Sequence, residues 1–276
     1  MTTIALVGAG GKMGCRITDN LNDGQYTVHY LEVSPAGQER LRERGVSVTQ
    51  PADALPIADV VILAVPDVRI AVVSQEMVAQ MRPGALLVLL DPAAPLDGAV
   101  AHRDDVPAFI AHPCHPSVFN WEPTEPSFRD FYGGISAKQS IVCALMHGTE
   151  ADYELGVAVA QAMYAPIDRT HRLTLEQMAI LEPALVETLA QSCMELVKQG
   201  YDMTVAQGVP AEAARDFLLG HLRIQIAVLF GEVNGTFSDA AYKISARAHP
   251  ILFQDDWKRI FAMDDIRRQV RDITTE

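Results

Sequence analysis

Hydrophobic residues in the first half of the chain gather in short continuous runs. The clearest continuous run covers residues 60–65, and further strand candidates cover residues 4–7, 27–32, 86–90, 108–111 and 141–146. A run without polar alternation is typical of a strand that helices cover on both faces. Amphipathic or Pro-bounded segments separate these runs. The pattern therefore predicts an α/β fold with a doubly wound, mostly parallel sheet of the Rossmann type.

The pattern changes after Gly148, where apolar positions follow a helical period of about 3.6 residues. Long helices are predicted over much of 150–164, 175–199 and 211–233. Thr174 and Gln177 have the spacing of a capping box, so a helix should begin at Leu175. We expect a Rossmann domain over residues 1–148, followed by an all-α domain over residues 149–276.

A glycine-rich turn joins the first predicted strand to a helix-like segment at residues 15–21. Glycines in such a turn let the backbone approach a pyrophosphate, which binds at the helix N-terminus. The third glycine comes one residue later than in G-x-G-x-x-G, so the match is to a longer variant. The turn predicts a dinucleotide site that includes Gly8, Gly10, Gly11, Lys12, Met13 and Gly14.

Two more residues are expected to contact the dinucleotide. Glu32 ends the second predicted strand about 20 residues past the glycine turn, where a carboxylate accepts hydrogen bonds from ribose hydroxyls. The same carboxylate would repel a 2′-phosphate, which favours NAD over NADP. Pro66 follows the strand at 60–65, at the sheet edge where ligands bind, and should lie on the nicotinamide side.

Composition and charge narrow the classes of function. The chain is 49% hydrophobic, has a formal net charge of −13 and shows no dense cluster of Lys and Arg, so nucleic acid is not an expected partner. No apolar run approaches the ~20 residues of a membrane span, and the N-terminus shows no secretory pattern. Four scattered cysteines suit reduced thiols. We expect a cytoplasmic protein.

A histidine-rich loop follows the predicted strand at 108–111. His112 and His115 stand among prolines, which restrict the backbone and hold the imidazoles at little entropic cost. Both are candidate catalytic residues. His112 can act as a general base that takes a hydroxyl proton while hydride leaves for the nicotinamide, or it can bind a metal.

Glu182 falls within the apolar face of the helix predicted at 175–199, and Pro183 follows it. An ionised carboxylate that faces a core needs a partner, which can be a metal or an Arg or Tyr side chain. We interpret Glu182 as a second ligand, with His112, of zinc or a similar divalent metal. Lys243 is the candidate that would hold a substrate carboxylate.

The glycine turn, Ala64-Val65-Pro66 and the long helices together resemble the 6-phosphogluconate and 3-hydroxyacyl dehydrogenase superfamily. More narrowly, the stretch Ala-His-Pro-Cys-His-Pro at 111–116 with Phe119-Asn120, and Leu181-Glu182-Pro183, is similar to the D-apionate oxidoisomerases. That resemblance implies NAD-dependent oxidation of D-apionate with migration of a carbon group, which yields 3-oxo-isoapionate. It also implies a metal held by His112 and Glu182, with His115 nearby.

Two other functions remain open at this point. One is plain NAD-dependent dehydrogenation of a 3-hydroxy acid, with His112 as the base and no metal. The other is a non-catalytic NAD-binding sensor. Because the predicted helices of the second half carry broader apolar stripes than one sheet face needs, we also expect a homodimer.

Overall fold

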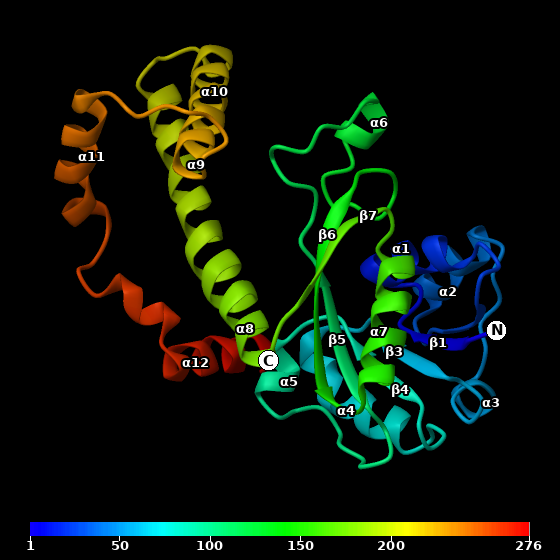
Figure 1. Cartoon of the computed structure of the whole chain (residues 1–276). Helices are drawn as coiled ribbons and strands as arrows, with labels where there is room; N and C mark the ends of the chain where they lie inside the picture. The colour runs from blue at the N-terminus through cyan, green and yellow to red at the C-terminus, as the bar shows by residue number, and fades with distance from the viewer. Residues whose placement is uncertain (276) are drawn as a thin grey trace. The chain divides into compact units, whose positions relative to one another are not determined.

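A seven-stranded sheet forms the centre of the N-terminal part of the chain (Figure 1). The computed structural model describes residues 1–275. The strand order is β2-β1-β3-β4-β5-β6-β7. The strands from β2 to β5 pair in parallel, β6 runs antiparallel to β5, and β7 runs parallel to β6. This confirms the predicted mostly parallel sheet. The strand bounds are β1 Thr3–Val7, β2 Thr27–Leu31, β3 Val60–Leu63, β4 Leu86–Leu89, β5 Ala108–Pro113, β6 Gln139–His147 and β7 Ile167–Arg172.

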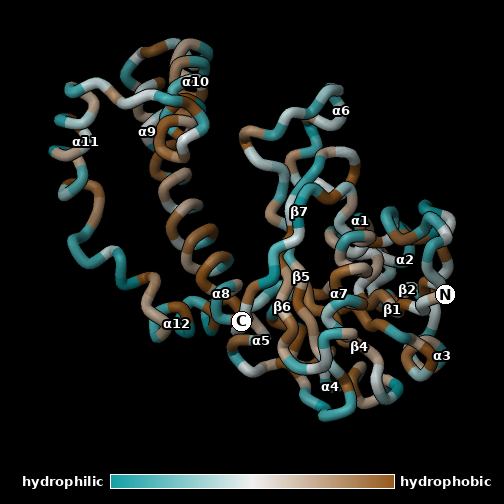
Figure 2. Tube along the Cα trace, in the orientation of Figure 1, coloured by the Kyte–Doolittle hydropathy of each residue, from teal (hydrophilic) through white to brown (hydrophobic). Residues whose placement is uncertain are grey.

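The predicted runs match six of these strands, and β7 is the one that sequence reasoning missed. The β7 sequence, Ile-Asp-Arg-Thr-His-Arg, contains no apolar run, and none of its residues is buried. It lies at the edge of the sheet, where it pairs only with β6. Figure 2 shows the contrast between the hydrophobic central strands and this polar edge. A solvated edge strand needs no apolar pattern, so periodicity alone does not reveal it.

Helices accompany the sheet in the order of a doubly wound fold. Their bounds are α1 Lys12–Leu21, α2 Pro35–Glu43, α3 Pro51–Ala54, α4 Asp67–Val78, α5 Ala93–Leu96, α6 Glu125–Phe128 and α7 Glu150–Met163. The remaining helices are α8 Leu175–Ala179, a π-helix η1 Ile180–Gln191, α9 Ser192–Ala206, α10 Ala211–Leu229, α11 Asp239–Leu252, a 3-10 turn η2 Trp257–Phe261 and α12 Met263–Thr274.

The start of α8 is set by the predicted capping box. The Thr174 hydroxyl accepts from the Gln177 backbone N–H at 3.2 Å, and the Gln177 side chain accepts from the Thr174 N–H at 2.9 Å. The chain then winds as a π-helix through Pro183. Proline has no N–H to donate, and a wider turn accommodates the missing helical bond.

The chain forms two compact units. The first contains Met1–Leu181 and the segment that starts at Arg267, and the second contains Glu182–Ile266, which is helical. Both α7 and β7 follow residue 148 and belong to the first unit, where α7 packs on β5 and β6. The domain division predicted at residue 148 stays a prediction. Among residues 1–275, no helix is long and apolar enough to cross a membrane.

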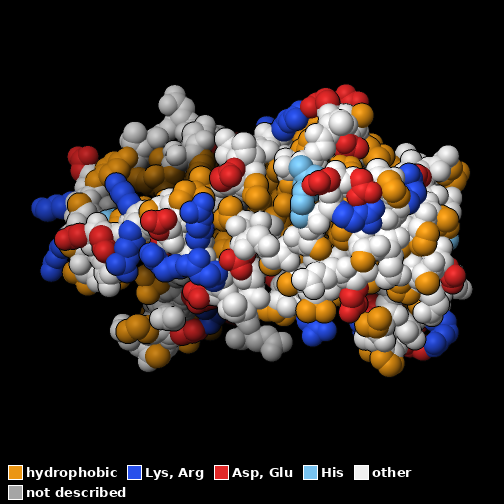
Figure 3. Space-filling view, turned by 90° about the horizontal axis from the view of Figure 1, so that it is seen from below, with side chains coloured by type: hydrophobic (Ala, Val, Ile, Leu, Met, Phe, Trp, Pro, Cys, Tyr) orange, Lys and Arg blue, Asp and Glu red, His pale blue; other side chains and the backbone are white. Residues whose placement is uncertain are grey.

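The helices of the second unit bury few of their own residues. Among the described residues, α9 and α11 have no buried side chain, and α10 has only Ala214. Large apolar side chains are instead exposed along them. Figure 3 shows hydrophobic side chains at the molecular surface among the charged ones.

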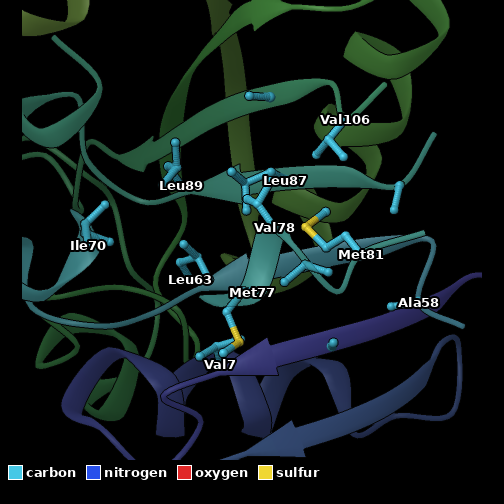
Figure 4. Packing of buried hydrophobic residues seen from close by; sticks show 14 of the residues in the cluster. Val7, Ala58, Leu63, Ile70, Met77, Val78, Met81, Leu87, Leu89 and Val106 are labelled. Atoms are coloured by element: carbon cyan, nitrogen blue, oxygen red, sulfur yellow. The ribbon is translucent and has the colours of Figure 1, made fainter. Parts of the chain in front are cut away.

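The core of the first unit has one layer on each face of the sheet, because successive side chains of a strand point to opposite faces. On one face, strand residues such as Leu63 and Leu87 pack against Met77 and Met81 from α4 and the turn after it (Figure 4). On the other face, Phe109 of β5 packs against α7. The continuous apolar runs thus reflect strands that are covered on both sides.

The contact between α7 and β5 depends on a glycine. A methyl group at Gly156 would meet the Phe109 ring at 2.7 Å, so Gly156→Ala overpacks this face. We expect the variant to lose about 1–3 kcal/mol of unfolding free energy, measured by urea denaturation. Ala158→Ser, at an exposed position of the same helix, is the control and should change stability by less than about 0.5 kcal/mol. Equal stability of the two variants would contradict this account of the packing.

Candidate active site

The parallel strands β1, β3, β4 and β5 end at one edge of the sheet, and two cavities open there. The first, about 490 Å³, is lined by Gly8, Glu32 and Pro66, among others. The second, about 320 Å³, is lined by Lys12, Asp91 and His112, among others. Gly11 and the segment Ala64–Pro66 line both. The arrangement suits a ligand with two ends, such as a dinucleotide.

The glycine turn brings the backbone close to this edge. Gly8 has a φ of +78°, which favours glycine, and a side chain at Gly14 would collide with the Gly8 carbonyl oxygen. The helix α1 begins at Lys12 without a side-chain cap, so its first N–H groups are available to a bound anion. Of the predicted cofactor residues, Gly11, Lys12, Met13 and Pro66 line the second cavity, and Gly8, Gly11, Glu32 and Pro66 line the first.

Glu32 lies in the first cavity, and two backbone groups hold its carboxylate. One oxygen accepts from the Gly10 N–H at 3.0 Å and the other from the Ser34 N–H at 2.8 Å. Arg40 donates to the Gly10 carbonyl at 2.7 Å from the other side of the turn. A carboxylate has about four acceptor sites, so Glu32 keeps capacity for ribose hydroxyls.

The second cavity brings together ionisable groups from three strand ends. His112, at the end of β5, donates from Nδ1 to the Pro113 carbonyl at 2.9 Å. The other nitrogen, Nε2, thereby keeps the lone pair that binds a metal or a proton, and it lies 3.9 Å from Asp91 Oδ2. Asp91 follows β4 and accepts from the Ala93 N–H at 2.7 Å.

Glu182 completes a possible set of metal ligands. One ligand atom each from Asp91, His112 and Glu182 lies within 4.8 Å of the others, and all three residues are partly buried. Glu182 comes one peptide bond after Leu181, whose side chain packs against the core of the first unit. The sequence predicted His112 and Glu182 and missed Asp91. Its position directly after an apolar run is the signal that could have identified it.

Asp67 is a second acidic residue of the site that was not among the predicted site residues. It follows Pro66 at the start of α4 and lines the second cavity. Burial, and then the negative charge of Asp91, raise the pKa of the Asp67 carboxyl to about 6.

The other two predicted catalytic residues lie elsewhere. His115 has a left-handed backbone, with φ of 59°, and donates from Nδ1 to the Tyr132 carbonyl at 2.8 Å. Its ring centroid is 6.4 Å from that of His112. Lys243 is exposed on α11 of the second unit and lines neither of the two cavities. Catalytic roles for His112, His115 and Lys243 stay predictions.

Comparison with known proteins identifies the family of the chain. Residues 3–99 match the model for the NAD binding domain of 6-phosphogluconate dehydrogenase, and residues 120–274 match that for the C-terminal part of decarboxylating phosphogluconate dehydrogenase. The D-apionate oxidoisomerase of Cupriavidus necator is 48% identical over 98% of this chain and 99% of its own length. That of Rhizobium rhizogenes is 47% identical over 99% and 100%.

A solved structure is similar over the same length. It is the crystal structure of a semialdehyde dehydrogenase NAD-binding protein from Cupriavidus necator, in complex with calcium and NAD. The two chains are 47% identical, with a TM-score of 0.97 and coverage of 99% of this chain and 100% of the other. A crystal structure from Jannaschia sp. CCS1 has a TM-score of 0.93 at 39% identity, with coverage of 99% and 98%.

The fold, the glycine turn and these relatives define an NAD-dependent oxidoreductase that acts on CH–OH groups. Within this class, the chain belongs to the family of the D-apionate oxidoisomerases. The resemblance that the sequence indicated is confirmed.

The raised pKa of Asp67 predicts a pH-dependent effect on stability. The ordinary pKa of this carboxyl is 3.8, so well below pH 4 it is protonated in both the folded and unfolded states. As the pH rises from about 4 to 6, the unfolded chain ionises before the folded one, and the fold loses stability. Asp67→Asn removes this charge. Because solvent screens a partly exposed group, we expect the variant to gain only about 1 kcal/mol above pH 6 and much less at pH 4.

Thermal melts of wild type and Asp67→Asn between pH 4 and 8, in the presence of a chelator, would measure this difference. A gain at pH 4 as large as that at pH 8 would show that the effect does not come from ionisation.

Proposed function

We propose that this enzyme oxidises D-apionate with NAD and transfers a carbon group within the product, which yields 3-oxo-isoapionate. Full-length similarity to D-apionate oxidoisomerases supports this substrate. The single observation that carries the proposal is that ligand atoms of Asp91, His112 and Glu182 lie within 4.8 Å of one another. Asp91 and His112 also line the second cavity, together with Lys12 and Met13 of the glycine turn. The proposed site thus puts metal-binding groups where a nicotinamide-linked substrate would lie.

A divalent cation fits these donor atoms. Two carboxylates and one imidazole form a mixed oxygen and nitrogen set that suits several divalent metals, zinc among them. Without a cation, two partly buried carboxylates close together would repel one another. The related Cupriavidus necator structure is in complex with calcium as well as NAD. When bound, such a cation polarises a carbonyl and orients the oxygens of the substrate.

The chain's own residues would place the substrate and handle its proton. Oxidation of a CH–OH group moves a hydride to NAD and a proton to a base, and leaves a carbonyl. The Asp67 carboxylate lines the same cavity as Asp91 and His112 and can accept this proton. The hydrogen bond from His112 Nδ1 to Pro113 orients Nε2 for its role as ligand.

For the cofactor, we propose that Glu32 selects NAD over NADP. Its carboxylate is fixed by Gly10 and Ser34 at the first cavity, which would take the adenosine end. A 2′-phosphate there would meet a negative charge held in place by two hydrogen bonds.

The metal proposal predicts a specific loss in Glu182→Gln. We expect kcat/KM for D-apionate to fall at least about 10-fold, and bound metal measured by elemental analysis to fall with it. Glu176→Gln, which neutralises an exposed carboxylate of α8, is the matched control and should retain both. Exhaustive chelation should also abolish turnover of the wild type. Full activity after chelation would instead favour plain dehydrogenation with His112 as the base.

We also propose that a second copy of the chain covers the helices of the second unit. Large apolar side chains are exposed along them, among them Leu185, Val186, Met203, Phe217, Leu219, Leu229 and Phe230. Such a density of exposed apolar residues marks an interaction surface. Closed two-fold dimers are the commonest oligomers, so a homodimer is the simplest assembly that buries it.

Light scattering at micromolar concentration tests this assembly. We expect a mass of about twice the 30.1 kDa of the chain. Phe217→Asp should shift the protein towards the monomer, because Phe217 is 70% exposed in the single chain and would be covered in the dimer. A monomeric wild type would overturn the proposal.

A further inference from the structure

Two cations of α1 lie over one aromatic ring from the loop between β5 and β6. The Lys12 ammonium is 4.9 Å from the centroid of the Tyr132 ring, and the Arg16 guanidinium carbon is 4.4 Å from it. Lys12 and Arg16 are one helical turn apart, so they share a face of α1. Each distance is within the range of a cation–π contact.

Neither cation has an acidic partner. Within residues 1–275, the side chains of Lys12 and Arg16 make no hydrogen bond and no ion pair, although the chain has a net charge of −13. Two like charges within 5 Å of one ring centroid repel each other, and a bound anion would reduce that repulsion. Lys12 also lines the second cavity, together with Asp67, Asp91 and His112, and is the only Lys or Arg among its lining residues.

Tyr132 lies in a segment whose backbone makes several hydrogen bonds. The Asp130 carboxylate accepts from the backbone N–H groups of residues 135, 136 and 137 at 2.9–3.1 Å, and it is 8% exposed. His115 donates to the Tyr132 carbonyl at 2.8 Å. These bonds hold the backbone that carries Tyr132, while its half-exposed ring contacts the His115 ring, with centroids 6.1 Å apart.

We propose that Lys12 and Arg16 form the subsite for the substrate's carboxylate, and that Tyr132 is a positioning residue for both cations. This inference rests on the proposed function, in which the substrate is the anion of a sugar acid. A cavity lined by two carboxylates would repel such an anion, and Lys12 supplies the compensating charge. The subsite would thereby distinguish an acid from its neutral analogues.

The diphosphate of NAD is another oxyanion that could bind the same cations. The structure favours the substrate carboxylate for two reasons. The uncapped N-terminus of α1 and the glycine turn already provide N–H groups for the diphosphate. In addition, Tyr132 lies on the loop that carries His115 and begins beside His112, at the end of the site where the chemistry is proposed.

The substrate carboxylate and the NAD diphosphate are distinguished by measuring the KM for D-apionate and the Kd of NADH in Lys12→Met and Arg16→Met. We expect KM for D-apionate to rise at least about 10-fold in each variant, with kcat changed only a few-fold. The Kd of NADH, measured by fluorescence without substrate, should stay within about twofold of the wild type. Arg42→Met, which removes an exposed guanidinium on α2, is the matched control and should change neither.

The role of Tyr132 is tested by two further variants. Tyr132→Phe keeps the ring and should behave as the wild type, whereas Tyr132→Leu should raise KM several-fold with little change in kcat. A merely structural role would lower kcat, KM and thermal stability together. Equal KM values in Tyr132→Leu and wild type would overturn the positioning role.

The decisive comparison is between D-apionate and its neutral amide. Calorimetry of both compounds with the enzyme–NADH complex should show the acid bound at least about 10-fold more tightly by the wild type, and this preference should vanish in Lys12→Met. Weaker binding of NADH alone in the variants, with an unchanged preference for the acid, would assign the cations to the diphosphate and overturn the inference. Absence of NADH formation from D-apionate by the wild type would refute the proposed function instead, and the binding comparison would still decide the subsite.

Discussion

Parallel strand pairing is the constraint on which the candidate site depends. When strands run in the same direction, their carboxyl ends meet at one edge of the sheet, and the residues that follow them lie together however far apart they are in sequence. Here Gly8 directly follows β1, and Asp67 comes four residues after the end of β3. Asp91 comes two residues after β4, and His112 lies at the end of β5. Hydrophobic burial on both faces holds these strands in register, so the same core that stabilises the fold also positions the chemistry.

The electrostatics of the site follow from this convergence. Asp67 and Asp91 line one cavity, Glu182 offers a third carboxylate close to Asp91, and the whole chain is acidic. Burial, and then the negative charge of Asp91, disfavour ionisation of Asp67 and raise its pKa. Positive charge at this edge of the sheet would therefore reduce the repulsion between these carboxylates. The proposed divalent cation would bind the carboxylates themselves, and the proposed Lys12 and Arg16 subsite would attract the substrate's own carboxylate.

The second unit follows a different principle. Its helices are amphipathic, yet Ala214 is the only buried residue of α9, α10 and α11 within the described chain. Helices in water derive most of their stability from packing of an apolar face, so a long helix pair without its own core needs a partner surface. The proposed homodimer would supply that surface, and the folding of the second unit would then be coupled to assembly.

By itself, the sequence determined the features that depend on neighbouring residues. Six strands, the glycine turn and the capping box at Thr174 were predicted because an apolar run, a tight turn and a helix cap are local properties. His112 and Glu182 were singled out by their immediate surroundings. Only the tertiary structure revealed β7, the positions of Asp67 and Asp91, and the ring of Tyr132 beneath two cations. An exposed edge strand carries no apolar pattern. A local pattern can place Asp91 at the end of a strand, but it does not record which distant residues lie beside it.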